Sequence, residues 1–427
     1  MKRALPLAMA LLVLPLSACG GGSGDDGGKA ATSKGPIKIW YANNPDEIAW
    51  AKKMVSSWNS AHPDEKVRAQ EIPAGKSSEE VIGAAITAGN APCLVFNTSP
   101  AAVSQFQKQG GLVPLDDFPG AAQHIQKRSG DAAEQYKSED GKYYQLPWKS
   151  NPVMISYNKD VFEKAGLDAD KPSLKTYKDF LATSEKLVDK GGVKAAVWPA
   201  PSSEFFQSWF DFYPLFAAES GGKQLVEDGK AQFTGPEGRA VADFWRSMYD
   251  KDLSQKEKYN GDAFADGKAA MTIAGPWAVK VYDKKVDYGV VPVPTSKGQS
   301  AAETRTFSDA KSVGLFSSCK NRGTAWDVLK FASSKEQDRK LLETTGQMPV
   351  REDLTGNYAD FFEKNPKYKT YAQAAENTVE VPNVPKSIAA WQAFRDAYSR
   401  SVIFGKENPQ TALKKAAAEV EKLAAQK

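Results

Sequence analysis

The feature that most constrains the fold of this chain is an alternation of short apolar strands with amphipathic helices, which begins with IKIWYA at residues 37–42. This stretch is rich in β-branched and aromatic residues that alternate with others, as in a β-strand. Ile48, Ala51, Val55 and Trp58 then recur at spacings of three and four, with polar residues between them. This period predicts an amphipathic helix directly after the first strand.

The same alternation continues through most of the chain. Further strands are predicted at 67–72, 93–97, 269–274 and 288–294, and helices at 77–86, 101–109, 177–190, 236–249, 324–333 and from Asn408-Pro409 onward. Strands that alternate with helices are typical of α/β folds, so we expect a largely parallel sheet. In such sheets ligands bind outside the carboxyl ends of the strands. Trp277, which follows the predicted strand 269–274 and Gly275-Pro276, is expected at such an edge.

The N-terminal residues predict export and a lipid anchor. Lys2 and Arg3 precede an apolar run, residues 4–16, that is too short to span a bilayer. The run ends in LSACG, which resembles the lipobox of bacterial lipoproteins, with Cys19 as the lipidated residue. We therefore expect a signal peptide at 1–18 and a flexible glycine-rich tether at 19–35. The alternative is an ordinary secretory peptide that contains a cysteine by chance.

This reading predicts a protein on the outer face of the cytoplasmic membrane, held there by lipid, in a Gram-positive bacterium. The formal charge of +4 falls to +2 once Lys2 and Arg3 are removed. Because this near-neutral chain has no basic block, it does not favour nucleic acid as a partner. Outside the cell, Cys93 and Cys319 form either a disulfide or two buried thiols.

Motifs for catalysis, metals and cofactors are missing from the sequence. It has neither G-x-S-x-G nor H-E-x-x-H, and the GKS at residues 75–77 lacks the upstream glycine of a phosphate-binding loop. The two histidines, His62 and His124, are far apart in the chain. We therefore predict no catalytic residue, no metal and no cofactor. A secreted glycoside hydrolase stays an alternative, since it needs only two carboxylates at a fixed separation.

Aromatic rings beside small polar residues are the pattern that points to a ligand. The chain has ten Trp, fifteen Tyr and twenty Phe, and several stand at predicted loop or strand ends. The rings and their polar neighbours are Tyr41 with Asn43 and Asn44, Trp148 with Asn151, Trp209 with Phe210, and Trp277. Sugars have flat C–H faces that pack on rings and hydroxyls that pair with amides and charged groups. For any single ring, core packing explains the pattern equally well.

Four stretches carry a resemblance to a known family. They are YYQLPWKSNPVMISYNKDVFEKAGL at 143–167, FADGKAAMTIAGPWAV at 264–279, GQMPVRED at 346–353, and the tail from 390 to 423. In content, order and spacing they resemble the bacterial extracellular solute-binding proteins of carbohydrate ABC importers, the maltose-binding-protein-like group (solute-binding protein family 1). The resemblance runs from about residue 37 to residue 423.

The resemblance implies a two-lobed periplasmic-binding-protein-like α/β fold with a hinge and a ligand cleft between the lobes. Lobe 1 is expected at 36–150 plus 308–358 and lobe 2 at 151–307 plus 359–427, with crossings near Ser150, Phe307 and Tyr358. The implied function is capture of a neutral sugar, a di- or oligosaccharide, and its delivery to the permease subunits of an ABC transporter. The protein is expected to act as a monomer.

The resemblance also suggests ligand-binding residues. Trp277 and Trp391 match rings that stack on sugar, Asn43 and Asn44 lie in the first strand-to-helix loop, and Asn97 and Ser99 end the third strand. Asn151 stands where many relatives carry an acidic sugar contact, which changes the kind of acceptor at that place. These residues complete the predicted cleft together with the rings named above.

Three charged residues have two readings each. Arg351 either bonds ligand hydroxyls or ties its lobe together, and Asp309 with Lys311 forms either a ligand contact or a solvated hinge pair. Together with Lys149, these cations leave open a receptor of the same fold for a phosphorylated or cationic solute. A surface adhesion or sensor protein without a permease is a further alternative.

Overall fold

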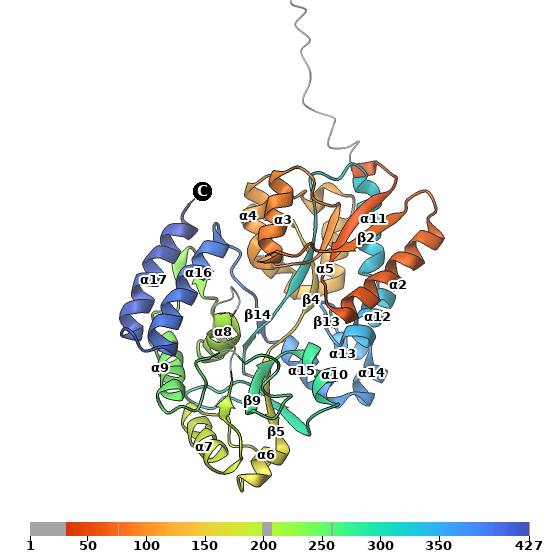
Figure 1. Ribbon diagram of the computed structural model, residues 1–427. Coiled ribbons are helices and arrows are strands. Elements are labelled where there is room, and N and C mark those ends of the chain that lie inside the picture. Colours follow the sequence, from red (N-terminus) through yellow and green to blue (C-terminus); the bar gives the residue numbers. More distant parts are fainter. Residues whose placement is uncertain (1–30, 76, 199–206, 258, 427) are drawn as a thin grey trace, which may run out of the picture.

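The chain folds into two α/β lobes, each built around its own sheet (Figure 1). The computed structural model describes residues 31–75, 77–198, 207–257 and 259–426. The predicted signal peptide, Cys19 and most of the predicted tether therefore lie outside the described residues. Within that part of the chain, no helix is long and apolar enough to cross a membrane.

The first lobe contains a six-stranded sheet. In spatial order its strands are β13 (Met348–Pro349), β4 (Leu146–Ser150), β12 (Lys311–Leu315), β3 (Leu94–Thr98), β1 (Ile37–Tyr41) and β2 (Val67–Glu71). β1 runs parallel to β2 and β3, whereas β12 is antiparallel to both β3 and β4, and β13 is antiparallel to β4. The expectation of a largely parallel sheet is therefore wrong, because β12, which returns from the other lobe, and β13, which follows α12, both run opposite to the other strands.

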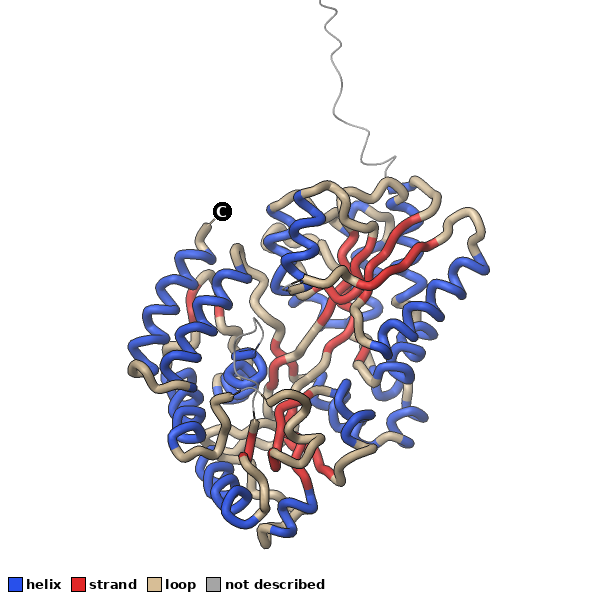
Figure 2. The backbone as a smooth tube through the Cα atoms, in the orientation of Figure 1, coloured by secondary structure: helices blue, strands red, loops and turns tan. Residues whose placement is uncertain are grey.

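Helices cover both faces of this sheet (Figure 2). They are α2 (Pro45–Ala61), α3 (Ser78–Thr87), α4 (Val103–Lys108), α5 (Ala121–Ser129), α11 (Arg322–Ala332) and α12 (Lys335–Thr345), with 3₁₀ turns η1 (Pro100–Ala102), η2 (Leu115–Asp117) and η3 (Gly130–Tyr136). α2 begins where predicted because the Asn44 side chain accepts a hydrogen bond from the Glu47 amide and Pro45 suits the first turn. Its Trp50, Met54 and Trp58 are buried against the sheet.

The second lobe contains a four-stranded sheet in the order β10 (Tyr288–Val291), β5 (Met154–Asn158), β9 (Ala269–Ala274) and β6 (Ala195–Val197). Two short pairs accompany it, β11 (Thr306–Phe307) with β14 (Thr378–Val379) and β7 (Val226–Glu227) with β8 (Lys230–Ala231). β10 is shorter than predicted and ends before Pro292, which has no N–H to donate to a neighbouring strand.

The remaining helices belong to the second lobe or lie beside both lobes. They are α6 (Lys159–Lys164), α7 (Tyr177–Lys190), α8 (Gln207–Glu219), α9 (Pro236–Asp250), η4 (Pro276–Ala278), α10 (Val279–Tyr282), α13 (Leu354–Asn357), α14 (Ala359–Lys364), α15 (Pro366–Ala375), α16 (Ser387–Tyr398), the π-helical turn η5 (Ser399–Ile403) and α17 (Pro409–Ala424). The predicted helices at 177–190, 236–249 and after Asn408 are confirmed.

Separate apolar cores stabilise the lobes. In the first lobe, Trp50, Phe96, Trp148 and Leu315 belong to one buried cluster between the sheet and its helices. The largest cluster belongs to the second lobe and extends from β5 to α16 and α17. A disulfide joins Cys93, just before β3, to Cys319, after β12, so the disulfide of the two predicted alternatives is the one observed.

The chain passes directly from one sheet to the other at two places. β4 ends at Ser150 and β5 begins at Met154, while β11 ends at Phe307 and β12 begins at Lys311. A third connection runs from β13 through α13, α14 and α15 to β14, and its Tyr358 is buried in a cluster with Met154 and Met348. The two direct connections are short and lie side by side, paired antiparallel at Pro152 and Ser308, which is typical of a hinge between two bodies.

Candidate functional site

One edge of the six-stranded sheet collects the ends of all its strands. The carboxyl ends of β1, β2 and β3 meet there because these strands are parallel and in register, with Tyr41 opposite Glu71. β12 starts at the same edge, since Ser312 pairs with Thr98, and β4 ends there, since Lys149 pairs with Lys311. Both direct crossings leave from this edge, so it faces the second lobe.

A buried ion pair stands at the centre of this edge. Lys149 Nζ lies 2.5 Å from Glu47 Oε1, and both residues are nearly enclosed, at 1% and 3% exposure. Gln347 donates a further hydrogen bond to the same oxygen at 3.0 Å. Burial alone would raise the pKa of Glu47, but the Lys149 charge and these hydrogen bonds outweigh it and lower the pKa below the ordinary value.

Asn151 connects the two crossing segments instead of presenting its amide to open space. Its Nδ2 donates to the backbone carbonyl of Asp309 at 3.1 Å and to Gln347 Oε1 at 3.2 Å. Its backbone carbonyl accepts a hydrogen bond from the Asp309 amide at 3.0 Å. Next to it, Asp309 forms an ion pair with Lys311, and both side chains are partly exposed. The predicted charged pair is therefore present at the crossing.

Two β-bulges re-aim the side chains at this edge. In β3, Phe96 and Thr98 pair with consecutive residues of β12, which leaves Asn97 as the extra residue, with a positive φ of 83°. In β4, Pro147 pairs with Ser312 and Lys149 with Lys311, so that Trp148 is the extra residue of the second bulge. Bulges of this kind redirect side chains next to functional sites, and asparagine tolerates a positive φ better than most residues. Asn97 remains partly exposed at the edge.

A groove of about 700 Å³ opens between α3 and α4 of the first lobe and the start of α16 in the second. Side-chain amides of Gln105, Gln109 and Gln392 line it, together with Thr87 and Lys386. Two hydrogen bonds join the lobes beside it, from the Ser104 amide to Asn383 Oδ1 at 2.8 Å and from Lys108 Nζ to the Gln426 carbonyl at 2.9 Å. Amides both donate and accept, which suits hydroxyl-rich ligands.

Glu79 links this groove to the charged edge. It lines the groove, is 4% exposed, and its Oε2 makes no hydrogen bond within the described part of the chain. Burial raises its pKa, although Lys311 opposes that shift and Asp309 adds to it. A buried carboxyl oxygen without a partner is costly, so a ligand group that pairs with it gains more than it would at the surface.

Trp277 lies at the corresponding edge of the second sheet. It follows the carboxyl end of β9, where Ala274 pairs with Met154, the first residue of β5 after the crossing. Its ring is partly buried and folds back over Gly275, where an added Cβ would lie only 2.0 Å from the ring. The predicted position at a C-terminal sheet edge is confirmed, and glycine at 275 makes the close approach of the ring possible.

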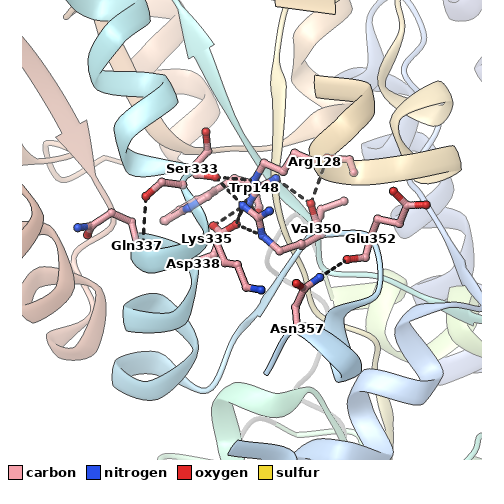
Figure 3. A network of polar contacts seen from close by, with 12 residues as sticks. Arg128, Trp148, Ser333, Lys335, Gln337, Asp338, Val350, Glu352 and Asn357 are labelled. Carbon is pink, nitrogen blue, oxygen red and sulfur yellow. Dashed lines mark hydrogen bonds and ion pairs between the residues drawn. The ribbon is translucent and has the colours of Figure 1, made fainter. Parts of the chain in front are cut away.

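Arg351 ties the first lobe together. Its Nε donates to Asp338 Oδ2 at 2.9 Å and its Nη2 to the Ser333 carbonyl at 2.8 Å. Arg128 binds the same carboxylate from α5, at 2.9 Å and 3.1 Å, and donates to the carbonyls of Trp148 and Val350 (Figure 3). The network holds α5, α12, β4 and β13 together. Of the two roles predicted for Arg351, these contacts support the structural one.

Several residues predicted at the site pack elsewhere. Trp148 is 1% exposed and packs against Trp50 and Phe96, with ring centroids 5.2 Å from each. Trp391 is fully enclosed in the core of the second lobe, and Tyr41 belongs to that of the first. None of these three rings has an open face for a ligand, because sheet and helix side chains cover them.

The other predicted residues differ in their exposure and in what their side chains contact. Asn43 is exposed, whereas the Asn44 side chain is used as the cap of α2. Ser99 is buried at the start of η1. The backbone of Trp209 and Phe210 lies in the first turn of α8, and their side chains fall outside the described residues. Ligand contact by the predicted residues that remain at the cleft stays a prediction.

The sequence analysis did not single out Glu47, Glu79 and Gln347. Both glutamates stand in the first turn of a helix, where acidic residues are common because they favour the helix dipole. Only the tertiary structure shows that they are buried beside Lys149 and Lys311. Gln347 belongs to the GQMPVRED stretch, and that signal alone could have drawn attention to it.

Three cations left a receptor for a phosphorylated solute as an alternative function. Each of them is paired with a carboxylate. Lys149 pairs with Glu47, Lys311 with Asp309 and Arg351 with Asp338. A phosphate site needs cations or amides free to bind the anion. Among the described residues, no group of three or more His, Cys, Asp or Glu is arranged to hold a metal ion.

Comparison with known proteins gives one consistent result. The family model described as bacterial extracellular solute-binding protein matches residues 53–370. The chain is 22% identical over 378 residues to a maltotriose-binding protein of Pyrococcus abyssi, covering 86% of this chain and 78% of that protein. It is 24% identical over 452 residues to a diacetylchitobiose binding protein of Streptomyces coelicolor, covering 100% of both.

Solved structures agree on the fold. The crystal structure of a cyclic alpha-maltosyl-1,6-maltose binding protein from Arthrobacter globiformis aligns with a TM-score of 0.77 at 20% identity, over 92% of this chain and 99% of the other. At this identity the likeness speaks for the fold alone, which is the two-lobed architecture described above.

Proposed function

This chain belongs to the bacterial extracellular solute-binding protein family, and we propose from this premise that it captures a neutral di- or oligosaccharide between its lobes and presents it to the permease subunits of an ABC importer. The relatives named above are described as binding maltotriose, diacetylchitobiose and a cyclic maltosyl-maltose, all neutral oligosaccharides. Their common chemistry supports a neutral oligosaccharide as the ligand of this chain.

The observation that carries the proposal is the groove between α3, α4 and α16, whose walls come from both lobes. Gln105, Gln109 and Gln392 supply paired donors and acceptors for hydroxyl groups. Its volume lies within the range of about 300–1,000 Å³ usual for small-molecule sites. Glu79 extends this polar wall toward Asp309 and Lys311, and Trp277 offers a ring at the opposing sheet edge.

The mechanism is binding and hinge closure without a covalent change. The segments at 151–153 and 308–310 act as hinges, and lobe boundaries near 150 and 307 follow from them. Closure around the sugar excludes water, so that the amide hydrogen bonds and ring contacts gain strength. On this account the protein is not an enzyme, and no carboxylate pair has to act on a glycosidic bond.

The mature protein is a monomer attached to the outer face of the cytoplasmic membrane through lipid on Cys19. The LSACG motif and the glycine-rich stretch after it support this attachment. A long flexible tether of this kind suits a Gram-positive cell, where the receptor of an importer has to remain near its permease.

A thermal-shift screen of the purified protein tests the proposal. Neutral mono-, di- and oligosaccharides are compared with phosphorylated and cationic solutes as controls. A ligand that binds only the folded state raises the melting temperature, by an amount that grows with the ligand concentration above its dissociation constant. We expect a concentration-dependent rise with one class of neutral oligosaccharide.

Two results would contradict the proposal in different ways. Shifts with phosphorylated or cationic solutes alone would keep the receptor fold but reject the sugar. Release of shorter sugars during incubation would indicate a hydrolase instead of a receptor, and chromatography of the incubated oligosaccharides measures it directly.

A further inference from the structure

The two lobes also touch where α10 of the second lobe meets the end of α12 of the first. Lys280 in α10 donates through its Nζ to the backbone carbonyl of Glu343 at 3.2 Å and to that of Thr344. The preceding residue, Val279, is 2% exposed and belongs to one buried cluster with Leu342 of α12. The contact between the lobes at this place therefore has a polar part and an apolar part.

The end of α12 explains why these two carbonyls accept from a side chain. The last carbonyl groups of a helix have no N–H of the same helix to accept from. Gly346, which follows α12 with a left-handed φ of 70°, donates its N–H to the Leu342 carbonyl at 2.8 Å. The next two carbonyls, of Glu343 and Thr344, accept from Lys280. The helix dipole also favours a cation at a C-terminus, so Lys280 completes the cap of a helix in the other lobe.

The same short helical segment carries the ring that the proposed function places at the cleft. The 3₁₀ turn η4, which contains Trp277, continues without a break into α10, which contains Lys280. Residues three apart in a helical turn are neighbours on its surface. A displacement of this segment moves both side chains, so the bond of Lys280 to α12 also fixes where Trp277 lies relative to the first lobe.

We propose that Lys280 is a positioning residue for sugar binding. By donating to the C-terminal carbonyls of α12, it holds the Trp277 ring at a fixed place relative to the first lobe and stabilises the lobe arrangement that encloses the sugar. The proposal rests on the proposed function, which assigns this ring to the cleft. Lys280 acts through Trp277 and through lobe closure, and it needs no contact with the ligand.

Fluorine NMR of the full purified protein, labelled with 5-fluorotryptophan, tests the position of the ring without a ligand. The Trp277 signal is identified as the one that is missing in Trp277→Phe. Lys280→Met removes the charge and the donors and should shift or broaden this signal, whereas Lys280→Arg keeps both and should leave it near its wild-type position. Lys284→Met is the matched control, because Lys284 is an exposed lysine just after α10, and it should leave the signal unchanged.

Binding kinetics give the second readout. Because the contact joins the lobes, it forms as they close and has to break before they open, so it affects release of the sugar more than capture. In stopped-flow measurements with the oligosaccharide found by thermal shift, Lys280→Met should raise the dissociation rate about tenfold, the scale of one hydrogen bond to a charged group. The association rate should change less. Lys280→Arg should restore most of the slow dissociation, and Lys284→Met should not alter it.

Three results would overturn the proposal. They are a Trp277 signal that Lys280→Met leaves unchanged, a signal that Lys284→Met alters as much, and equal dissociation rates in Lys280→Met and the wild type. Failure of every neutral oligosaccharide to bind would instead contradict the proposed function. The fluorine measurement is made without ligand, so it decides whether Lys280 holds the ring even in that case, and the two proposals fail separately.

Discussion

Two buried charged clusters occupy neighbouring positions on β4, and they differ in how completely their polar atoms are paired. Arg128 donates to the carbonyls of Pro147 and Trp148, and it shares Asp338 with Arg351. The next residue, Lys149, belongs to the edge cluster with Glu47, Asp309, Lys311 and Glu79. In that cluster Glu47 Oε2 and Glu79 Oε2 have no hydrogen-bond partner within the described chain.

The contrast indicates that the two clusters beside β4 have different roles, one in stability and one in binding. A saturated cluster, in which every polar atom is hydrogen-bonded, stabilises the fold but has no free donor or acceptor for a ligand. An unsaturated cluster keeps acceptors available. Burial of charge alone does not mark a site, because both clusters contain a fully buried ion pair. The unpaired oxygens next to the groove between α3 and α16 mark the side where ligand binding is expected.

The largest effect is expected from breaking the saturated cluster. Arg128→Met leaves the Asp338 carboxylate buried with half of its partners and removes hydrogen bonds to four carbonyl groups. The free energy of unfolding should fall by about 3–5 kcal/mol, as measured by urea denaturation. Arg339→Met removes two exposed ion pairs, with Glu343 and Asp360, and is the control. Equal losses in both variants would refute the structural role of the network.

The next effect concerns binding instead of stability. Trp277→Ala removes a ring at the edge of the second sheet and should weaken oligosaccharide binding by about 1–3 kcal/mol, the scale of burying an apolar side chain. Calorimetric titration measures the change. Phe404→Ala, which truncates an exposed ring, should leave the affinity as it is. Unchanged affinity in Trp277→Ala would remove this ring from the site.

A pH profile tests a buried carboxyl near the crossing, that of Glu380. Because burial raises the pKa of Glu380 from 4.5 to about 8, the folded protein holds a proton there that the unfolded chain releases above pH 4.5. This contribution to stability is present below pH 4.5 and is lost as the pH rises to about 8, at up to ~1.4 kcal/mol per pH unit. Urea denaturation at pH 6.5 and 7.5 should show the loss in the wild type and not in Glu380→Gln.

The choice of that window separates Glu380 from His124. Burial, with the charges of Arg128 and Lys330, lowers the pKa of His124 from 6.5 to about 4. The unfolded chain then binds the extra proton between pH 4 and 6.5, so this contribution grows with pH and is complete above 6.5. If Glu380→Gln keeps the wild-type slope above pH 6.5, the carboxyl does not carry the buried proton.

The smallest effect on stability is expected from Glu79. Since its Oε2 has no partner, Glu79→Ala should change the free energy of unfolding by less than about 1 kcal/mol, far less than Arg128→Met. Oligosaccharide affinity should fall up to about tenfold, because the groove loses the buried carboxyl group of its wall. Glu139→Ala, on an exposed glutamate that does not line the groove, is the control. A large stability loss without an affinity change would place Glu79 with the saturated cluster.

The sequence predicted the elements of this fold well and their directions poorly. Apolar periodicity and caps locate α2, α3 and α7 because these signals are local. The directions of β12 and β13 are not local properties, because β12 follows the return of the chain from the second lobe and β13 follows the path through α11 and α12. The disulfide of Cys93 with Cys319 brings together residues 226 positions apart, which no local pattern indicates.

At the site, too, local features were predictable from the sequence and features set by tertiary contacts were not. The position of Trp277 was predictable because a buried strand and a Gly-Pro turn precede it. Trp148 and Trp391 have similar rings and polar neighbours, yet both are enclosed, because the face a ring presents depends on a bulge or on helix packing. Glu47 and Glu79 resembled ordinary first-turn acids until the tertiary structure placed them beside Lys149 and Lys311.

The central claim, that this chain captures a neutral oligosaccharide between its lobes, is tested most directly by calorimetric titration of the purified protein. The oligosaccharide that raises the melting temperature most is titrated into the wild type and into Gln392→Ala, which removes an amide from the groove. We predict saturation at one sugar per chain and weaker binding in the variant. Absence of saturable heat with every neutral oligosaccharide, or equal affinity for both proteins, would contradict the account.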